Sequence, residues 1–265
     1  MEDLPNNTGC KFLDLFDCHC AFGSYSAPGL KVFRSASHIR AEMDRVGIGE
    51  ALVYSNVARE CDTQIGNNEL LRAVAVDDRL HPAWVLTPDL GSWLPSFGER
   101  VDRMLQAGVR AAYMFPTFHQ FTLSPWQVDG LLSELSEHRV PLFLDFGNKH
   151  WSERLTDWDA VDAVCGRFPE LPVVMVHEGL ASVRTLTPLL ARNPNLHVEI
   201  SYFQPNTGIK VFAQEFGPDR LLFGTGMPVY DPGCPISMIA YAPISVEWKQ
   251  AIAGCNLRRL LGGVC

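Results

Sequence analysis

The sequence lacks three features, each of which would assign it to a familiar class of protein. None of its eight cysteines stands in a C-x-x-C pair, which argues against a zinc knuckle or a thioredoxin-type redox motif. No G-x-G-x-x-G follows the first apolar segment, which argues against a dinucleotide-binding sheet. No apolar run approaches the ~20 residues that cross a bilayer, so no membrane partner is expected.

Positive charge is also scarce. The chain carries 22 Lys and Arg against 30 Asp and Glu, which gives a net charge of -8. Because an acidic surface repels phosphate backbones and no basic cluster offsets it, nucleic acid is excluded as a partner. Residues 1–8 are polar and lack the apolar core of a signal peptide, so we expect a cytoplasmic protein with reduced thiols.

The chain does contain a regular alternation of short apolar runs and helical patterns. Its 265 residues, 47% of them hydrophobic, are enough for a large core. Near-continuous apolar runs separated by helices are typical of parallel strands that are buried on both faces. The predicted strands are residues 12–19, 51–56, 81–87, 110–116, 141–146, 172–177, 196–202 and 220–225.

The helices between these strands are predicted from a 3.6-residue period. Ile39, Met43 and Val46 fall at i, i+4 and i+7, and Gly47 follows as a helix C-cap. Similar patterns occupy residues 97–105, 125–135, 157–167, 182–191, 208–216 and 246–261. Eight strands, each followed by a helix, close a barrel. We therefore expect an α/β fold, a (β/α)8 TIM barrel, as one domain over residues 1–265; a doubly wound open sheet is the alternative.

Polar side chains gather where the predicted strands end, which is where such barrels place their active sites. Asp17 and His19 share a face of the first strand because side chains alternate. Asp145 ends the fifth strand and His177 the sixth, and a buried carboxylate is costly unless it is paired or bound to metal. We predict that these four residues are catalytic. The structural alternative is that Asp17 only holds His19 by a hydrogen bond.

Other side chains near the strand ends are predicted to contact a substrate. Glu199 and Tyr202 belong to the seventh strand, although Glu199 is also explained as part of a polar layer inside the barrel. The predicted substrate-binding residues are Tyr54, Tyr113, Asn148, Glu199 and Tyr202. The apolar stretch of residues 235–243 is interpreted either as a lid or as a contact between two copies in a homodimer.

The order of these motifs resembles that of the amidohydrolase-related barrels, the group that contains carboxymuconate-semialdehyde decarboxylase-like enzymes and related metal-dependent hydrolases. The resemblance spans residues 12–261. It rests on the D-x-H of the first strand, on the V-x-x-x-H-x-G that contains His177, and on the L-L-F-G-T-x-x-P that begins at Leu221. The pattern of residues 253–261 is similar to the closing helix of the family.

The resemblance implies a metal site, and the chain departs from the family at three of five positions. Ala21 stands where the family has the second ligand His of the first strand, and Asp145 where it has a ligand His on the fifth. Gly226 replaces the carboxylate that serves as a ligand and general base on the eighth strand. The metal ligands that remain are His19, Asp145 and His177, and three ligands plus a water make a workable zinc site. The implied cofactor is one divalent metal, zinc before others, or none.

Two classes of function follow. The first is a hydrolase or lyase that acts on a small carboxylated or cyclic molecule, either with a metal or by metal-free lactonase chemistry. A metal enzyme would need Asp17 or Glu199 to replace the missing base, whereas a metal-free one would use His177 or Asp145 as acid or base. The second class is a catalytically inactive barrel that serves as a binding or scaffold protein, which the three substitutions favour. The retained Asp17, His19 and His177 favour an enzyme.

Overall fold

A computed structural model describes residues 13–26, 30–88, 95–147, 156–205 and 207–265. Asn148, which was predicted to contact substrate, lies outside the described residues. The parallel strands form two hydrogen-bonded sheets. One sheet consists of β1 (Leu15–Phe22), β2 (Ile48–Ser55) and β3 (Leu80–Pro82). The other consists of β4 (Trp84–Val85), β5 (Ala112–Met114), β6 (Leu142–Leu144), β7 (Val173–Met175), β8 (Leu196–Glu199) and β9 (Leu221–Leu222).

The first junction between the two sheets lies within one short stretch of chain, because β3 and β4 are separated only by Ala83. The Ala83 N–H donates a hydrogen bond of 2.8 Å to the Val53 carbonyl of β2. The next residue, Trp84, donates one of 3.1 Å to the Ala111 carbonyl that precedes β5. One broken strand therefore pairs with β2 on one side and with β5 on the other.

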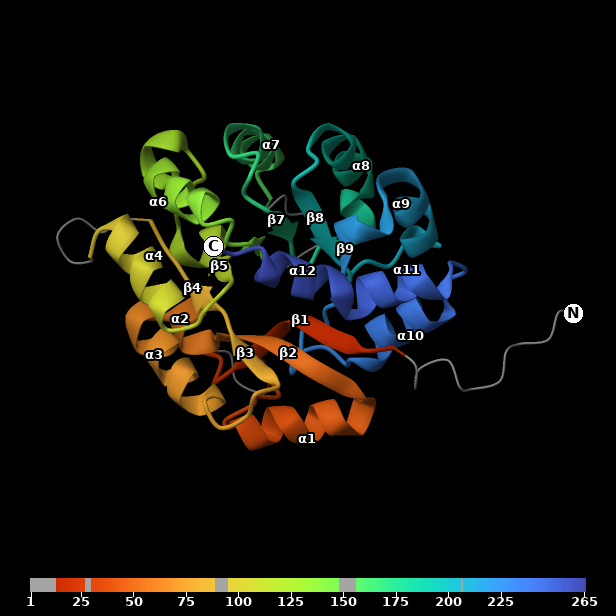
Figure 1. Cartoon of the computed structure of the whole chain (residues 1–265), viewed down its shortest axis with the longest axis horizontal. Coiled ribbons are helices and arrows are strands. Elements are labelled where there is room, and N and C mark those ends of the chain that lie inside the picture. Colours follow the sequence, from red (N-terminus) through yellow and green to blue (C-terminus); the bar gives the residue numbers. More distant parts are fainter. Residues whose placement is uncertain (1–12, 27–29, 89–94, 148–155, 206) are drawn as a thin grey trace, which may run out of the picture.

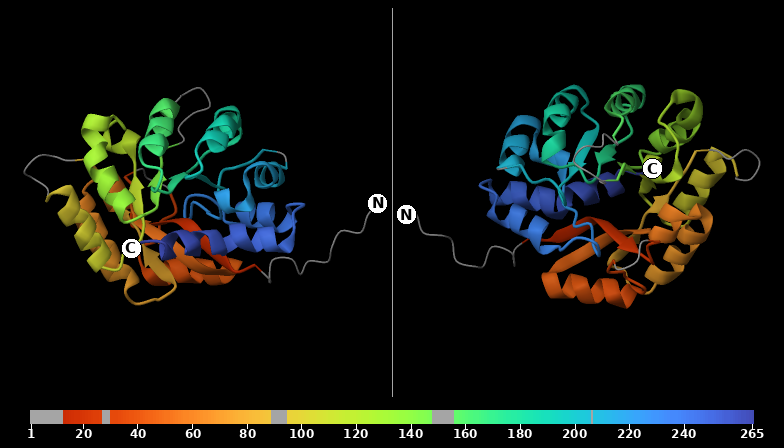
Figure 2. Two further views of the ribbon diagram at one scale, coloured as in Figure 1. Left: turned by 45° about the horizontal axis from the view of Figure 1, so that its top comes forward. Right: turned by 180° about the vertical axis from the view of Figure 1, so that it is seen from behind.

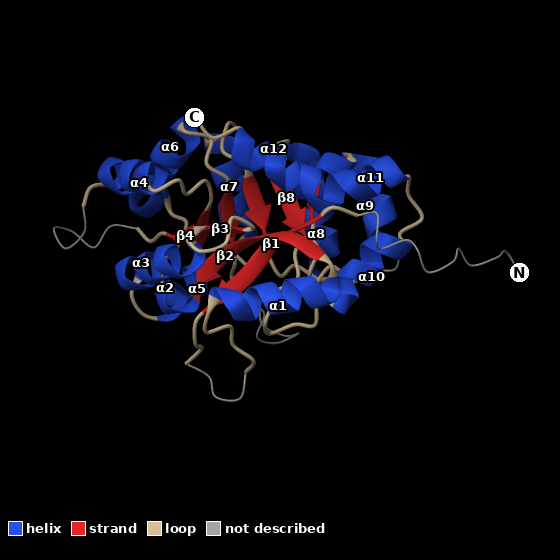
Figure 3. Cartoon of the chain, turned by 60° about the horizontal axis from the view of Figure 1, so that its bottom comes forward, coloured by secondary structure: helices blue, strands red, loops and turns tan. Residues whose placement is uncertain are grey.

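The second junction joins the last strand to the first. The Cys18 N–H of β1 donates to the Phe223 carbonyl at 2.9 Å, and the Ala21 N–H donates to the Met227 carbonyl at 2.8 Å. Backbone hydrogen bonds thus link the sheets at both edges, and the strands form a ring (Figure 3). The expected (β/α)8 TIM barrel is confirmed.

Helices lie around the outside of this ring (Figure 1). They are α1 (Ala36–Val46), α2 (Asn56–Glu60), α3 (Thr63–Val74), α4 (Phe97–Gln106), α5 (Pro116–His119), α6 (Pro125–Glu137), α7 (Trp158–Arg167), α8 (Val183–Arg192), α9 (Gly208–Phe216), α10 (Gly233–Tyr241), α11 (Val246–Gln250) and α12 (Asn256–Gly262). Figure 2 shows the same outer layer from two further sides. Within the described residues, the model has no helix long and apolar enough to cross a membrane.

Helix ends follow the local sequence signals. Gly47 has a φ of 79° and caps α1 by donating its N–H to the Met43 carbonyl, as the sequence predicted. The predicted helix over residues 246–261 is instead α11 and α12 joined by a π-helical turn, Ala251–Cys255. The apolar stretch of residues 235–243 lies mostly in α10, and Ile236 and Ile239 are buried in the core. Core packing therefore accounts for Ile236 and Ile239, whereas Tyr241 is exposed, and the lid and homodimer interpretations stay predictions.

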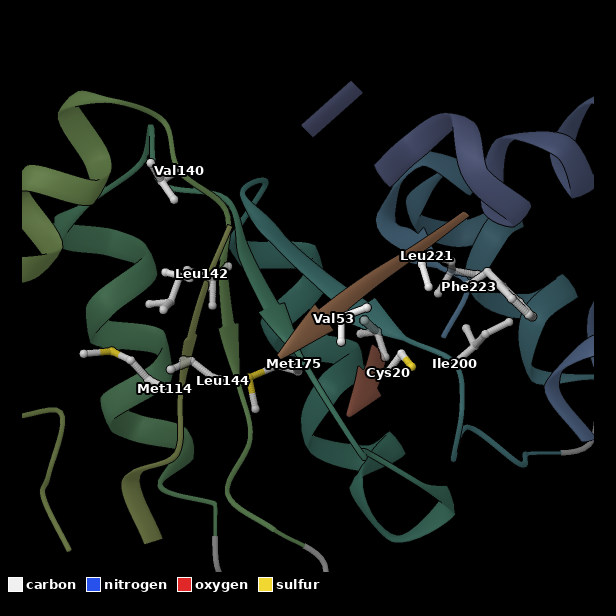
Figure 4. Packing of buried hydrophobic residues seen from close by; sticks show 14 of the residues in the cluster. Cys20, Val53, Met114, Val140, Leu142, Leu144, Met175, Ile200, Leu221 and Phe223 are labelled. Atoms are coloured by element: carbon white, nitrogen blue, oxygen red, sulfur yellow. The ribbon is translucent and has the colours of Figure 1, made fainter. Parts of the chain in front are cut away.

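Alternating side chains divide the core into two clusters. The outer cluster packs the strands against the helices and includes Leu142, Leu144 and Met175 (Figure 4). The inner cluster fills the barrel and includes Phe143 and Val174 from the same strands. Because β6 and β7 contribute to both clusters, these strands are buried on both faces, as their continuous apolar runs predicted.

The first strand departs from strict alternation. Its pairing with β2 shifts register between Asp17 and Cys20, which is a β-bulge or a similar irregularity. As a result Cys18 and Ala21 both belong to the inner cluster, while Cys20 belongs to the outer one. Strict alternation would place Cys18 and Cys20 on the same face, and the irregularity separates them because it reorients the side chains that follow it.

Candidate active site

Three residues meet at the carboxyl ends of three strands. His19 lies on β1, Asp145 directly follows β6, and His177 lies two residues beyond β7. One potential ligand atom from each lies within 4.8 Å of the others. Since parallel strands all end at the same mouth, residues separated by more than a hundred positions converge there. We call His19, Asp145 and His177 the trio.

Asp145 and His177 form a buried pair. The Oδ2 atom of Asp145 lies 3.1 Å from His177 Nδ1, and its Oδ1 accepts a hydrogen bond of 2.7 Å from the Gly147 N–H. Burial raises the pKa of Asp145, but the charge and hydrogen bond of His177 outweigh it and hold the pKa below its usual value. Burial lowers the pKa of His177, and the charge of Asp145 outweighs that effect and raises it. Each partner of this pair therefore stabilises the charged form of the other.

His177 also has an unusual backbone. Its φ is 61°, in the left-handed region that residues other than glycine seldom adopt. Such conformations persist where the surrounding structure holds them and are frequent at functional sites. The turn after β7 thus places the His177 ring beside His19, with the two ring centres 4.3 Å apart.

His19 is completely enclosed by polar and aromatic neighbours. Its Nδ1 lies 3.6 Å from Glu199 Oε2, and its Nε2 lies 3.3 Å from the Tyr54 hydroxyl. Burial lowers the pKa of His19, and the charge of His177 lowers it further. A neutral imidazole is the form that binds a metal. His19 is therefore the histidine of the trio that is best prepared to be a ligand.

Glu199, on β8, lies beside Nδ1 of His19. Its Oε2 accepts a hydrogen bond of 2.7 Å from the Ser201 hydroxyl, and its Oε1 accepts one from the Ser201 N–H. Burial raises the pKa of Glu199, but the neighbouring His19 outweighs burial, so the pKa is lowered and the group is a carboxylate. A Cβ atom on Gly224 would overlap the Glu199 side chain, so the glycine on the neighbouring strand makes room for it. Glu199 is thus both buried inside the barrel and adjacent to the trio.

Asp17 is not part of the trio. Its Oδ1 accepts hydrogen bonds of 2.9 Å from the backbone N–H groups of His19 and Thr225, and its Oδ2 accepts one of 2.5 Å from the Thr225 hydroxyl. Burial raises the pKa of Asp17 to about 7 despite these bonds. The carboxyl group ties β1 to the segment that follows β9. This geometry fits the structural interpretation, in which Asp17 holds His19 in place.

The predicted tyrosines occupy different depths. Tyr113 is fully buried, and its hydroxyl donates a hydrogen bond of 2.6 Å to the Cys18 carbonyl. Tyr54 is also buried but directs its hydroxyl to His19. Tyr202 is partly exposed, and its ring centre lies 5.9 Å from that of Tyr230. Tyr54 thus directs its hydroxyl to the trio, and the Tyr113 ring also lies near it, with its centre 6.0 Å from that of His19.

Tyr230 is a site residue that the sequence did not reveal. Its ring packs edge-on against His177, with ring centres 5.5 Å apart. Gly226 has a φ of 69°, and a Cβ atom there would lie 2.6 Å from Tyr230 Cδ2. An aromatic ring therefore fills the space next to the position where the sequence comparison expected a carboxylate. The only available signal was a tyrosine two residues after the eighth-strand motif, which is weak.

The trio fits a divalent metal ion. Two imidazoles and one carboxylate suit zinc, manganese or iron. Ligand atoms around such an ion lie about 3–4 Å apart, given bonds of ~2.0–2.2 Å, which the 4.8 Å limit accommodates. Glu199 beside His19 Nδ1 matches the carboxylates that commonly orient ligand histidines. Small adjustments of the side chains would complete the site.

Comparison with known proteins agrees with the assignment of the fold. A family model described as Amidohydrolase matches residues 31–263. The chain belongs to the amidohydrolase family, which agrees with the expectation of an enzyme. No curated protein matches the chain.

Several solved structures share its fold. An uncharacterized TIM-barrel protein from Bordetella bronchiseptica is 20% identical, with 95% of this chain and 99% of that chain covered and a TM-score of 0.74. The 5-carboxyvanillate decarboxylase from Novosphingobium aromaticivorans, complexed with manganese and 4-hydroxy-3-methoxy-5-nitrobenzoic acid, is 14% identical, with 99% of each chain covered and a TM-score of 0.78. The 2,6-dihydroxybenzoate decarboxylase from Rhizobium is 15% identical, with 94% and 99% covered and a TM-score of 0.69. At these identities the likeness concerns the fold.

Proposed function

We propose that this protein is an amidohydrolase-family enzyme that uses the trio to hold one divalent metal ion and acts on a small carboxylated substrate. The convergence of His19, Asp145 and His177 within 4.8 Å carries the proposal. Two proteins of similar fold are named decarboxylases of aromatic acids, and one of those structures contains manganese. These relatives support the substrate class, which we narrow to small planar acids.

The surrounding residues position this site. When bound, the metal would supply a Lewis acid that polarises a substrate oxygen. Glu199 would orient the His19 ring through Nδ1, and Asp17 would fix the His19 backbone. Of the two carboxylates expected to replace the missing base, Glu199 is the one beside the trio. Tyr230 would shield the Asp145–His177 pair from water because its ring covers one side of His177.

A second candidate is metal-free hydrolysis of an activated ester such as a lactone. The 3.1 Å contact between Asp145 and His177 favours it, because a carboxylate that orients an imidazole makes that imidazole an effective base. In this reaction His177 Nε2 would remove a proton from water as the water attacks the lactone carbonyl. The proton would later pass to the leaving oxygen.

Elemental analysis separates the two candidates. The protein would be purified without chelator and without a metal-binding tag, together with His19→Ala and Asp145→Ala and with the exposed control His38→Ala on α1. About one equivalent of metal, lost in both site variants and retained in the control, is expected. Metal retained in the site variants would refute the trio as the ligand set. A metal-free protein that hydrolyses lactones in chelator would support the second candidate, and one with no turnover would favour a scaffold.

A further inference from the structure

Arg59 lies at the mouth of the barrel on α2, the short helix that directly follows β2. Its side chain is only 13% exposed. The guanidinium carbon lies 3.9 Å from the ring centre of Phe118, 5.4 Å from that of Phe115 and 5.7 Å from that of Tyr25. A guanidinium held against aromatic faces keeps its N–H edge available for a planar anion. The aromatic rings therefore hold Arg59 without consuming its hydrogen-bond donors.

The described residues leave this guanidinium poorly paired. Its Nη1 lies 3.8 Å from Glu60 Oε1, which is long for an ion pair, and the other Glu60 oxygen already accepts a hydrogen bond of 2.6 Å from the Ser26 N–H. The Nε atom of Arg59 is buried and has no hydrogen-bond partner among the described residues. Buried donors are seldom left unpaired, because the missing hydrogen bond is costly. A bound anion would satisfy them.

Arg59 lies next to the trio through its aromatic support. A Cβ atom on Gly147 would lie 3.5 Å from Phe118 Cε2, so the Phe118 ring packs beside Gly147. The Gly147 N–H in turn donates to Asp145. After burial and His177, the charge of Arg59 also contributes to the pKa shift of Asp145. The Phe118 ring thus contacts both the Arg59 guanidinium and the residue whose N–H donates to Asp145.

We propose that Arg59 binds a carboxylate group of a small planar acid and directs the rest of that molecule toward the trio. This inference rests on the proposed function and identifies how the site would select its substrate. Asp145 and Glu199 place two buried carboxylates in and beside the trio, and the Arg59 guanidinium offers an acid a separate cationic point of attachment. A carboxylate also matches the fork of a guanidinium, which donates two parallel hydrogen bonds.

Calorimetric titration with benzoate and with its neutral analogue benzamide tests this assignment. Arg59→Met is expected to weaken benzoate binding about tenfold or more, since charge-assisted hydrogen bonds are lost, and to leave benzamide binding unchanged. Arg59→Lys should restore part of the benzoate affinity. The matched control is Arg72→Met on α3, which removes the same charge from an exposed position and should bind benzoate like the unmodified protein.

A structural role for Arg59 predicts a different result. If Arg59 only balanced the buried charge of Asp145, the Met variant would lose both ligands equally. Unchanged benzoate affinity in Arg59→Met, or no benzoate binding to the unmodified protein at millimolar concentration, would overturn the inference. Arg59-dependent binding in a protein without metal or turnover would keep it and refute the proposed function. Metal-dependent turnover together with benzoate binding that does not depend on Arg59 would support the proposed function and refute the inference about Arg59.

Discussion

The Asp145 carboxylate and the His177 imidazole lie 3.1 Å apart; Asp145 is completely buried and the His177 side chain is 11% exposed. In Asp145→Asn, the amide keeps the volume but loses the charge that raises the pKa of His177. We expect a loss of about 2 kcal/mol in the free energy of unfolding in chelator, less than is usual for a broken buried ion pair, because His177 can release its proton. Urea unfolding measures it, with the exposed Asp78→Asn as the control. An equal loss in both variants would contradict the importance of the pair.

His177→Ala is expected to remove activity while the barrel stays folded. His177 is the residue shared by the metal-bound and the metal-free candidates, so its loss should lower kcat/KM for any substrate by about a thousandfold. The backbone at this position has a φ of 61°, a region that histidine enters more readily than alanine, so the variant should lose about 1 kcal/mol of stability and remain folded. Steady-state kinetics measures the loss of activity, and circular dichroism checks that the barrel stays folded. Unchanged turnover would place the active site elsewhere.

Gly226 is expected to tolerate no side chain while Tyr230 is present. A Cβ atom would lie 2.6 Å from Tyr230 Cδ2, and a φ of 69° disfavours any residue but glycine. Gly226→Ala should therefore cost about 2–4 kcal/mol of stability, of which about 1–2 kcal/mol is backbone strain. In a Tyr230→Ala background only the strain should remain. Denaturant unfolding of the two single variants and the double variant measures this coupling, and additive losses would contradict a clash.

The strand-end pattern was sufficient to predict that His19, Asp145 and His177 lie together at the mouth of the barrel. Parallel strands in a closed barrel place their last residues at one mouth, so the position of a residue along its strand predicts its position in space. The predicted ends of the strands were less accurate. The predicted strand of residues 196–202 ends at Glu199, because the Ser201 N–H bonds to the Glu199 carboxylate rather than to a neighbouring strand.

Contacts between distant residues were not predictable from periodicity. Asp17 and Thr225 are 208 positions apart, and nothing in either segment indicates that the Asp17 carboxyl group accepts hydrogen bonds from Thr225. Arg59 and Tyr230 were missed for the same reason, since both come from segments beyond the strand ends. Their roles depend on which rings they meet, and that is decided by packing across the mouth rather than by local spacing.

His197, on β8, makes the fold sensitive to acid. It is buried, and its Nδ1–H donates a hydrogen bond of 3.1 Å to the Asn195 carbonyl. Burial, with the charges of Arg220 and Arg259, lowers the pKa of His197 from 6.5 to about 4. As the pH falls, His197 is therefore protonated near pH 6.5 in the unfolded chain but only near pH 4 in the folded protein. Stability is complete above this window and falls by about 3 kcal/mol as the pH drops through it.

Replacing His197 with asparagine tests the source of this sensitivity. Asparagine keeps a donor near the position of Nδ1 but carries no titratable group, so His197→Asn should lose less stability between pH 7 and pH 4 than the unmodified protein. Urea unfolding at a series of pH values gives the difference, and the exposed His38→Asn on α1 should follow the unmodified protein. Carboxylates elsewhere also titrate in acid and change the stability of both proteins. The test is therefore whether the difference in the free energy of unfolding between His197→Asn and the unmodified protein changes with pH. A difference that stays constant with pH would show that His197 titrates alike in the folded and unfolded states.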